Sequence, residues 1–276
     1  MARELSMPRT ATLRTVFAKT LRDQRKALAW WTLGFVGTVF MYAAFWPNVR
    51  DNAATFTQYL EDFPDFIRNL MGEVDFGTPE GYLQSELFSF LGPILLLVYA
   101  IGAGARATAG EEEAGSLDLL LSVPIRRRRV LLDKFWALLV ASLWLVLSVW
   151  LATVLLGPAF ELRPDLEGFT AACLMLFLLG LAFGTASMAV GAWTGSKSLA
   201  VGVPGGVALL TFILSTLAPS VDWLEPYRVL SPFYYASDPV PILHGVDVAH
   251  AGVLLGITVV ALLVALIAFE RRDLAA

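Results

Sequence analysis

The sequence predicts an all-α membrane protein with six transmembrane helices. Apolar residues make up 57% of the chain and charged residues only 16%, whereas a soluble domain has about 45–50% and about 25%. Six stretches contain no Asp, Glu, Lys or Arg, and each approaches or exceeds the roughly 20 residues that cross a bilayer. These stretches are continuously apolar and do not alternate in polarity, which favours helices over a β-barrel.

The six expected spans define a single transmembrane domain over residues 1–276. They cover residues 27–47, 87–105, 135–157, 168–194, 198–221 and 250–269. Between and before them lie a basic segment, 1–26, a charged loop, 106–134, and two outer segments, 48–86 and 222–249.

The basic segment 1–26 has the pattern of an interfacial helix. Its apolar residues recur at helical spacing, and its basic residues occupy other faces. Such a helix would lie on an anionic inner leaflet, and a disordered basic tail is the alternative. A cleaved signal peptide is disfavoured because no early apolar region and no typical cleavage site are found. The apolar positions are Leu13, Val16, Phe17, Leu21 and Leu28.

The distribution of basic residues predicts the orientation. Sixteen of the 20 Lys and Arg residues fall in 1–26, in the loop 106–134, at Lys197 or in the C-terminal tail. The other connections hold only Arg50, Arg68, Arg163 and Arg228, among many acids. By the positive-inside rule, both termini and the loop 106–134 are expected in the cytoplasm.

Two stretches of the chain resemble motifs of soluble enzymes, but neither matches well. Residues 102–107 loosely fit a dinucleotide fingerprint, but they close an apolar span, where small residues serve close helix packing. Residues 191–198 resemble a phosphate loop, yet Ser196 replaces its second glycine. His244, Asp247 and His250 are too few for a convincing zinc site. We therefore expect no enzyme activity, cofactor or metal in this chain, and the single Cys173 excludes an internal disulfide.

The spans also lack ionisable residues at their centres, which disfavours a carrier driven by protons. A sodium site made of carbonyls and hydroxyls remains open.

The loop 106–134 contains the most specific stretch of the sequence, GEEEAGSLDLLLSVPIRRRRVLLDKF, over residues 110–135. Ser116 can cap a short helix whose leucines form an apolar surface, and Pro124 would end it. Four arginines then precede the third span. A short amphipathic helix in this place can dock a partner, or it can lie on lipid headgroups with the arginines as an anchor of topology.

This stretch resembles the cytoplasmic loop of ABC-2 type transporter permeases. That loop follows the second span with the pattern GE-x-x-x-G-T/S-L-x-L-L-L-S-x-P-x-x-R-x-x-x-L-x-K-F, and it engages an ATPase subunit. The basic N-terminal segment, LSPFYYA at 230–236 and FERRDL at 269–274 are similar to the family as well. The resemblance implies a pair of permeases, each bound by a separate ATPase that carries ATP and Mg, in the plasma membrane of a prokaryote. No nucleic acid is expected as a partner.

The resemblance also selects candidate residues. Acids and arginines would set the docking register, and leucines would fill a groove on the ATPase. The coupling residues implied are Glu111, Glu112, Glu113, Gly115, Leu117, Leu120, Pro124, Arg126, Arg127, Arg128 and Arg129. Aromatic residues of the second span, Phe88, Phe90 and Tyr99, are candidates for the substrate pathway.

The substrate is open at this stage. Apolar spans suit efflux of a hydrophobic drug or antibiotic, but export of an ion, lipid or glycan, or maturation of a metalloenzyme, would use similar helices. A different class, a membrane protein that recruits a soluble partner without transport, is the main alternative.

Overall fold

The protein is an all-α bundle in a computed structural model that describes residues 9–53, 55, 75–113 and 126–271, with side chains from residue 16 onward. No strand occurs within these ranges. The predicted helix 116–124 lies outside the described residues.

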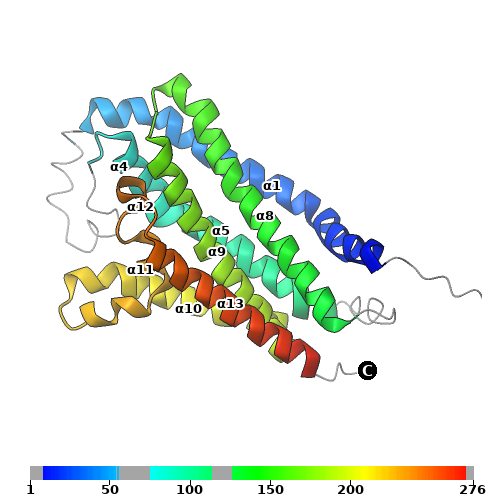
Figure 1. The fold of residues 1–276 in the computed structure, drawn as a ribbon. Helices are drawn as coiled ribbons and strands as arrows, with labels where there is room; N and C mark the ends of the chain where they lie inside the picture. The colour runs from blue at the N-terminus through cyan, green and yellow to red at the C-terminus, as the bar shows by residue number, and fades with distance from the viewer. Residues whose placement is uncertain (1–8, 54, 56–74, 114–125, 272–276) are drawn as a thin grey trace, which may run out of the picture.

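Six long helices form the bundle (Figure 1). Each is at least 24 residues long, or about 36 Å at 1.5 Å per residue, which is enough to cross a hydrocarbon core of about 30 Å. The six predicted spans are therefore confirmed. They are α1 (Arg9–Asp51), a second span built of α4 (Pro79–Leu83), η1 (Gln84–Leu91), α5 (Gly92–Ala105), η2 (Arg106–Gly110) and α6 (Glu111–Glu113), then α8 (Arg127–Leu156) with η3 (Gly157–Phe160), α9 (Leu166–Thr194), α10 (Lys197–Leu217) with η4 (Ala218–Ser220), and α13 (Val248–Arg271).

The second span contains two π-helical segments, η1 and η2, one on each side of α5. A π-helical turn inserts extra backbone into a helix and frequently marks a functional position. At the end of η1, a Cβ on Gly92 would lie 2.5 Å from the carbonyl oxygen of Leu87. Glycine is therefore required where the helix returns to its ordinary pitch.

Helix α9 is the centre of the bundle and packs against α5, α8, α10 and α13. In its apolar stretch 83% of the residues are buried, against 17% in α10. Small residues allow this packing, because a Cβ on Gly104 of α5 would lie 2.1 Å from the carbonyl oxygen of Gly184. The fingerprint-like residues 102–107 thus belong to a helix contact.

Two pairs of glycines at four-residue spacing, Gly180/Gly184 in α9 and Gly202/Gly206 in α10, differ in their surroundings. Gly180 and Gly184 face α5, where the side chain of Leu96 and the backbone of Ala100 fill the space. In contrast, nothing lies within 4 Å of an added Cβ on Gly202 or Gly206. The first pair therefore packs helices of one chain, and the second lies on an outward face.

Helix α1 is continuous from Arg9, so the expected boundary at residue 26 is not a break in the helix. Val16 is buried, and Leu21 and Leu28 pack against the core. These three residues thus contact the protein itself, which accounts for their spacing without a lipid leaflet. An interfacial position of the segment remains a prediction.

The segment before α13 consists of three short helices, η5 (Glu225–Leu230), α11 (Pro232–Ser237) and α12 (Pro241–His244). A proline stands in the first turn of each. Proline lacks the N–H that would continue a preceding helix but fits the first turn of a new one. The prolines thus divide this segment into short, separate helices.

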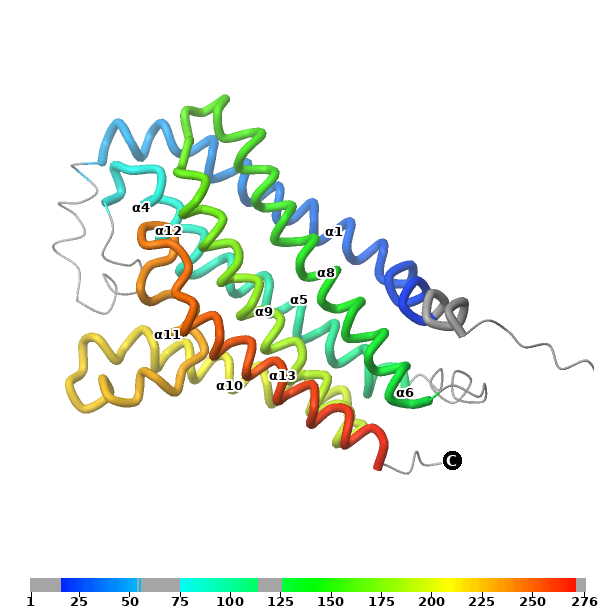
Figure 2. Tube along the Cα trace, in the orientation of Figure 1, coloured from blue at the N-terminus to red at the C-terminus, as the bar shows by residue number. Residues whose placement is uncertain are grey.

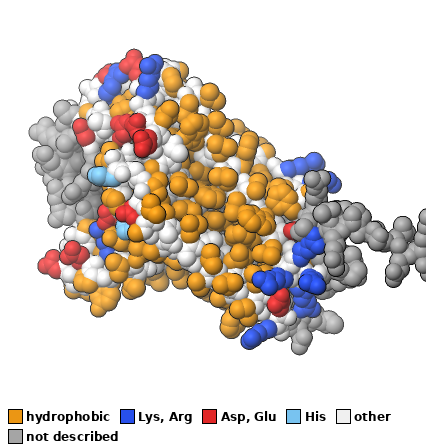
Figure 3. Space-filling model, in the orientation of Figure 1, with side chains coloured by type: hydrophobic (Ala, Val, Ile, Leu, Met, Phe, Trp, Pro, Cys, Tyr) orange, Lys and Arg blue, Asp and Glu red, His pale blue; other side chains and the backbone are white. Residues whose placement is uncertain are grey.

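The two ends of the bundle differ in charge, with an apolar band between them (Figure 3). What we call the basic end contains α6, the start of α8, the turn between α9 and α10, and the end of α13, which lie together in Figure 2. What we call the acidic end contains α4, η3, η5 and α12.

A cysteine-labelling experiment tests which end faces the cytoplasm. The native Cys173 is buried, whereas Ser198 at the basic end and Asp222 at the acidic end are exposed. In a Cys173→Ala background we expect a membrane-impermeant maleimide to label Asp222→Cys on intact cells and Ser198→Cys only after permeabilisation. The reverse pattern would refute the orientation that the positive-inside rule predicts.

Candidate functional site

A buried lysine organises the basic end. Lys134 of α8 has only 1% of its side chain exposed. Its Nζ donates to Glu111 Oε2 at 2.6 Å and to the carbonyl oxygen of Ala107 at 2.7 Å. A buried ammonium group requires such partners, since an unpaired charge in the protein interior is costly. The interaction ties the end of the second span to the start of the third.

Glu113 makes a second connection at the same end. Its Oε1 accepts a hydrogen bond of 2.9 Å from the backbone N–H of Lys197, the first residue of α10. A carboxylate is favourable there because a helix N-terminus carries partial positive charge and unpaired N–H groups. Glu111 and Glu113 thus connect the end of the second span to α8 and to α10.

The phosphate-loop-like residues 191–198 form the turn between α9 and α10. Gly195 takes a left-handed conformation with φ +64° and ends α9, as glycine commonly does at this position. Ser196 caps α10 by accepting a hydrogen bond from the N–H of Leu199. The motif is therefore accounted for as a helix–turn–helix connection.

The arginines occupy the first turn of α8. Arg126 and Arg128 are exposed, and Arg127 and Arg129 are half-buried. No acid accompanies them in that turn, although the helix dipole favours acids at a helix N-terminus. The helix dipole therefore does not account for four arginines at this position.

The predicted coupling residues are only partly described. Glu111, Glu112, Glu113 and Arg126 to Arg129 come together at the basic end, whereas Gly115, Leu117, Leu120 and Pro124 lie outside the described residues. Sequence reasoning missed Lys134 as a functional residue. Its signal was a lysine placed among the apolar residues that begin a span.

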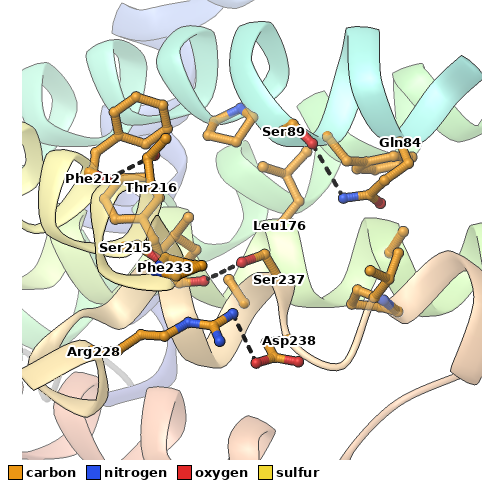
Figure 4. A pocket seen from close by; sticks show the side chains of 18 residues that line it. Gln84, Ser89, Leu176, Phe212, Ser215, Thr216, Arg228, Phe233, Ser237 and Asp238 are labelled. Atoms are coloured by element: carbon orange, nitrogen blue, oxygen red, sulfur yellow. Dashed lines mark hydrogen bonds and ion pairs between the residues drawn. The ribbon is translucent and has the colours of Figure 1, made fainter. Parts of the chain in front are cut away.

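The acidic end contains a cavity of about 330 Å³ (Figure 4). Its walls come from η1, α9, the end of α10 and the short helices of 225–241. Charged side chains reach it only from Arg228 and Asp238 within the described chain, and their Nη2 and Oδ2 atoms are 2.8 Å apart. The guanidinium of Arg228 also lies 4.8 Å from the ring centre of Tyr234, in the arrangement of a cation–π contact.

The three aromatic candidates for the pathway do not share one surface. Phe88 is buried and lines the cavity. Phe90 is 45% exposed beside Phe212 on the outside of the bundle. Tyr99 is buried near the other end, where its hydroxyl group donates to Gln24 Oε1 at 3.1 Å. Of the three, the structure places only Phe88 in the cavity.

The histidines near α13 contact the backbone. The Nδ1 atom of each donates to a carbonyl oxygen, that of Val240 for His244 and that of Asp238 for His250. A hydrogen bond from the backbone N–H of His250 lowers the pKa of the Asp247 carboxyl from its ordinary value. Within the described ranges, no group of three His, Cys, Asp or Glu side chains could hold a metal ion.

Six apolar helices that are long enough to cross a bilayer define a multi-pass membrane protein. The family described as "ABC-2 family transporter protein" matches residues 14–274, so the chain belongs to this family. It is also 32% identical over 198 residues to a "Probable ABC transporter permease protein NosY" from Pseudomonas aeruginosa. That match covers 66% of this chain and 70% of the relative.

Proposed function

We propose that the chain is the transmembrane permease subunit of an ATP-driven exporter and that its basic end couples, in the cytoplasm, to a separate ATPase. Two copies, or this chain and a paralogue, form the pathway, and the ATPase holds ATP and Mg. The observation that carries the proposal is the Lys134–Glu111 pair, since it fixes both flanks of the loop 106–134 in one place.

The contacts of the charged residues support a division of roles among them. Glu111 and Glu113 bind within the chain, so we assign them to positioning the loop rather than to direct docking. Exposed Arg126 and Arg128, together with residues 114–125, then form the docking surface. Arginines at that surface would orient an acidic region of the ATPase, because charges at an interface steer and align partners.

For the cargo we propose a hydrophobic drug or antibiotic. The wide apolar band of the bundle (Figure 3) and the cavity with its phenylalanine walls support this class.

A double substitution tests the coupling. We expect Leu120→Asp combined with Glu112→Lys to abolish stimulation of the ATPase by the permease, because it removes an apolar anchor and reverses a charge next to the docking surface. Stimulation is measured with the purified permease and its ATPase in lipid nanodiscs. The amount of inserted permease should be unchanged.

The matched control for the charge reversal of Glu112→Lys is Asp222→Lys, which makes the same reversal at an exposed position of the acidic end. It should leave stimulation intact. Normal stimulation in the double variant would refute docking at this loop. If the unsubstituted permease binds the ATPase but no cargo stimulates ATP hydrolysis, the result would instead favour a protein that only recruits a soluble partner.

A further inference from the structure

The cavity at the acidic end contains buried polar atoms that lack partners within the described chain. Gln84 is only 3% exposed, and its Oε1 accepts no hydrogen bond there. The Nε of Arg228 is likewise buried and donates none. Both residues line the cavity. Leaving such groups unpaired is costly, so native structures seldom retain them without a reason.

These two atoms differ in what they require. The Gln84 carbonyl oxygen is an acceptor and needs a donor, while the Arg228 Nε–H is a donor and needs an acceptor. Their neighbouring atoms are already engaged, since Gln84 Nε2 is 3.4 Å from Ser89 Oγ and Arg228 Nη2 pairs with Asp238. Figure 4 shows the two side chains on opposite sides of the cavity. A molecule that satisfies both has hydrogen-bonding groups at two separated points.

The remaining walls define the rest of that molecule. Arg228 and Asp238 neutralise each other, and the described chain brings no other charged side chain to the cavity. A charged ligand would thus meet no counter-charge, and burying an unpaired charge is unfavourable. The other lining combines apolar and aromatic side chains, including Phe88, Phe212 and Phe233, with the uncharged hydroxyl groups of Ser89, Ser215, Thr216 and Ser237. The volume of about 330 Å³ falls in the range of small-molecule sites.

From these contacts we infer that the cavity binds a small uncharged molecule with an aromatic or aliphatic body and hydroxyl or amide groups on two sides. Gln84 accepts a hydrogen bond from one polar group, and Arg228 Nε donates to the other. The phenylalanine walls enclose the body. Taking this molecule to be the exported cargo rests on the proposed function, whereas its binding by the chain does not.

The cavity also has a physical connection to the coupling end. Gln84, Phe88 and Ser89 belong to the π-helical segment η1, and the same span ends in η2 and Glu111. Both irregular segments flank the close contact of α5 with α9. A ligand that changes the geometry of η1 therefore acts on the helix that holds the loop 106–134.

Protection of a single cysteine measures occupancy of the cavity. Ala236→Cys, in a Cys173→Ala background, places one thiol in the wall, and N-ethylmaleimide reports its accessibility in nanodiscs without nucleotide or ATPase. Chloramphenicol serves as the probe because it is uncharged and has hydroxyl and amide groups around an aromatic ring. Tetraphenylphosphonium, a cation of apolar surface, is the comparison. We expect concentration-dependent protection by the first and none by the second.

Two variants test the assigned atoms. Gln84→Met removes the acceptor at similar volume, and Arg228→Lys keeps the charge for Asp238 without the Nε–H. Each should weaken protection about tenfold, the cost of one lost hydrogen bond to a buried group. Gln84→Met should also leave thermal stability equal or higher, because it removes an unpaired buried oxygen and, with it, only a long hydrogen bond of 3.4 Å to Ser89. Ser142→Ala removes another such oxygen outside the cavity and should leave protection unchanged.

The outcomes separate this inference from the proposed function. Absence of protection by chloramphenicol, equal protection by the cation, or full protection in both variants would overturn the binding site. Protection without any stimulation of the ATPase would leave the site standing and refute its role in export. Stimulation of the ATPase without protection of the thiol would refute the binding site and leave the proposed export standing.

Discussion

Replacing Glu111 by glutamine is expected to lower the free energy of unfolding by about 3 kcal/mol, because it leaves the ammonium group of Lys134 buried without a counter-charge. Lys134 is 1% exposed, whereas the side chain of Glu111 is 31% exposed. Lys134→Met should therefore lower the free energy of unfolding by less than Glu111→Gln does, since water still reaches the carboxylate of Glu111. The measurement is the thermal unfolding midpoint of the purified permease in nanodiscs, together with its stimulation of the ATPase.

The double variant Glu111→Gln with Lys134→Met provides the control. Removing both partners of a buried pair is often nearly neutral, whereas removing one is not. Its stability should therefore exceed that of Glu111→Gln alone, while stimulation of the ATPase stays low because the loop has lost its attachment. A double variant less stable than either single variant, or Lys134→Met less stable than Glu111→Gln, would contradict this account of the pair.

Gly104→Ala is the second substitution with a large expected effect. An added Cβ would lie 2.1 Å from the carbonyl oxygen of Gly184, so the backbones of α5 and α9 must separate. The same contact region contains the hydroxyl group of Ser187, which lies 2.8 Å from the carbonyl oxygens of Ile101 and Ala200. We expect a loss of about 3 kcal/mol, at the upper end for an overpacked core, measured as thermal stability and as yield of folded protein.

Gly202→Ala is the matched control, since nothing lies within 4 Å of its added Cβ. Alanine is the better helix former by roughly 0.5–1 kcal/mol, so stability should stay equal or rise. The two glycine substitutions are thus expected to act in opposite directions. A similar loss in both would refute the assignment of Gly104 to backbone contact and Gly202 to an outward face.

The second span illustrates how far sequence reasoning reaches. Its apolar composition predicts a helix near residues 87–105, and the structure confirms a span that extends from Pro79 to Glu113. The extension could not be foreseen, because Glu86, Arg106 and Glu111 look like ends of a span. Each is instead accommodated by the surrounding helices or by the π-helical segments, which local composition does not encode.

The candidate sites show the same division. The charged loop 106–134 stands out in the sequence because its charges interrupt an apolar chain and match a family pattern. The role of Lys134 depends on its distance to Glu111, which lies 23 positions away. The cavity joins η1 to α9, α10 and Arg228, segments separated by long stretches of sequence, so no local pattern indicates it.

The sequence by itself determined the all-α membrane class, the number of spans and the family, because lipid requires continuous apolar helices and the loop motif is local. Only the tertiary structure decided which glycines bring helices together, which acids bind within the chain, and where two polar groups meet a cavity. Those properties depend on distances between residues remote in sequence. Hydrophobicity sets which segments leave water, but side-chain packing and pairing set how they meet.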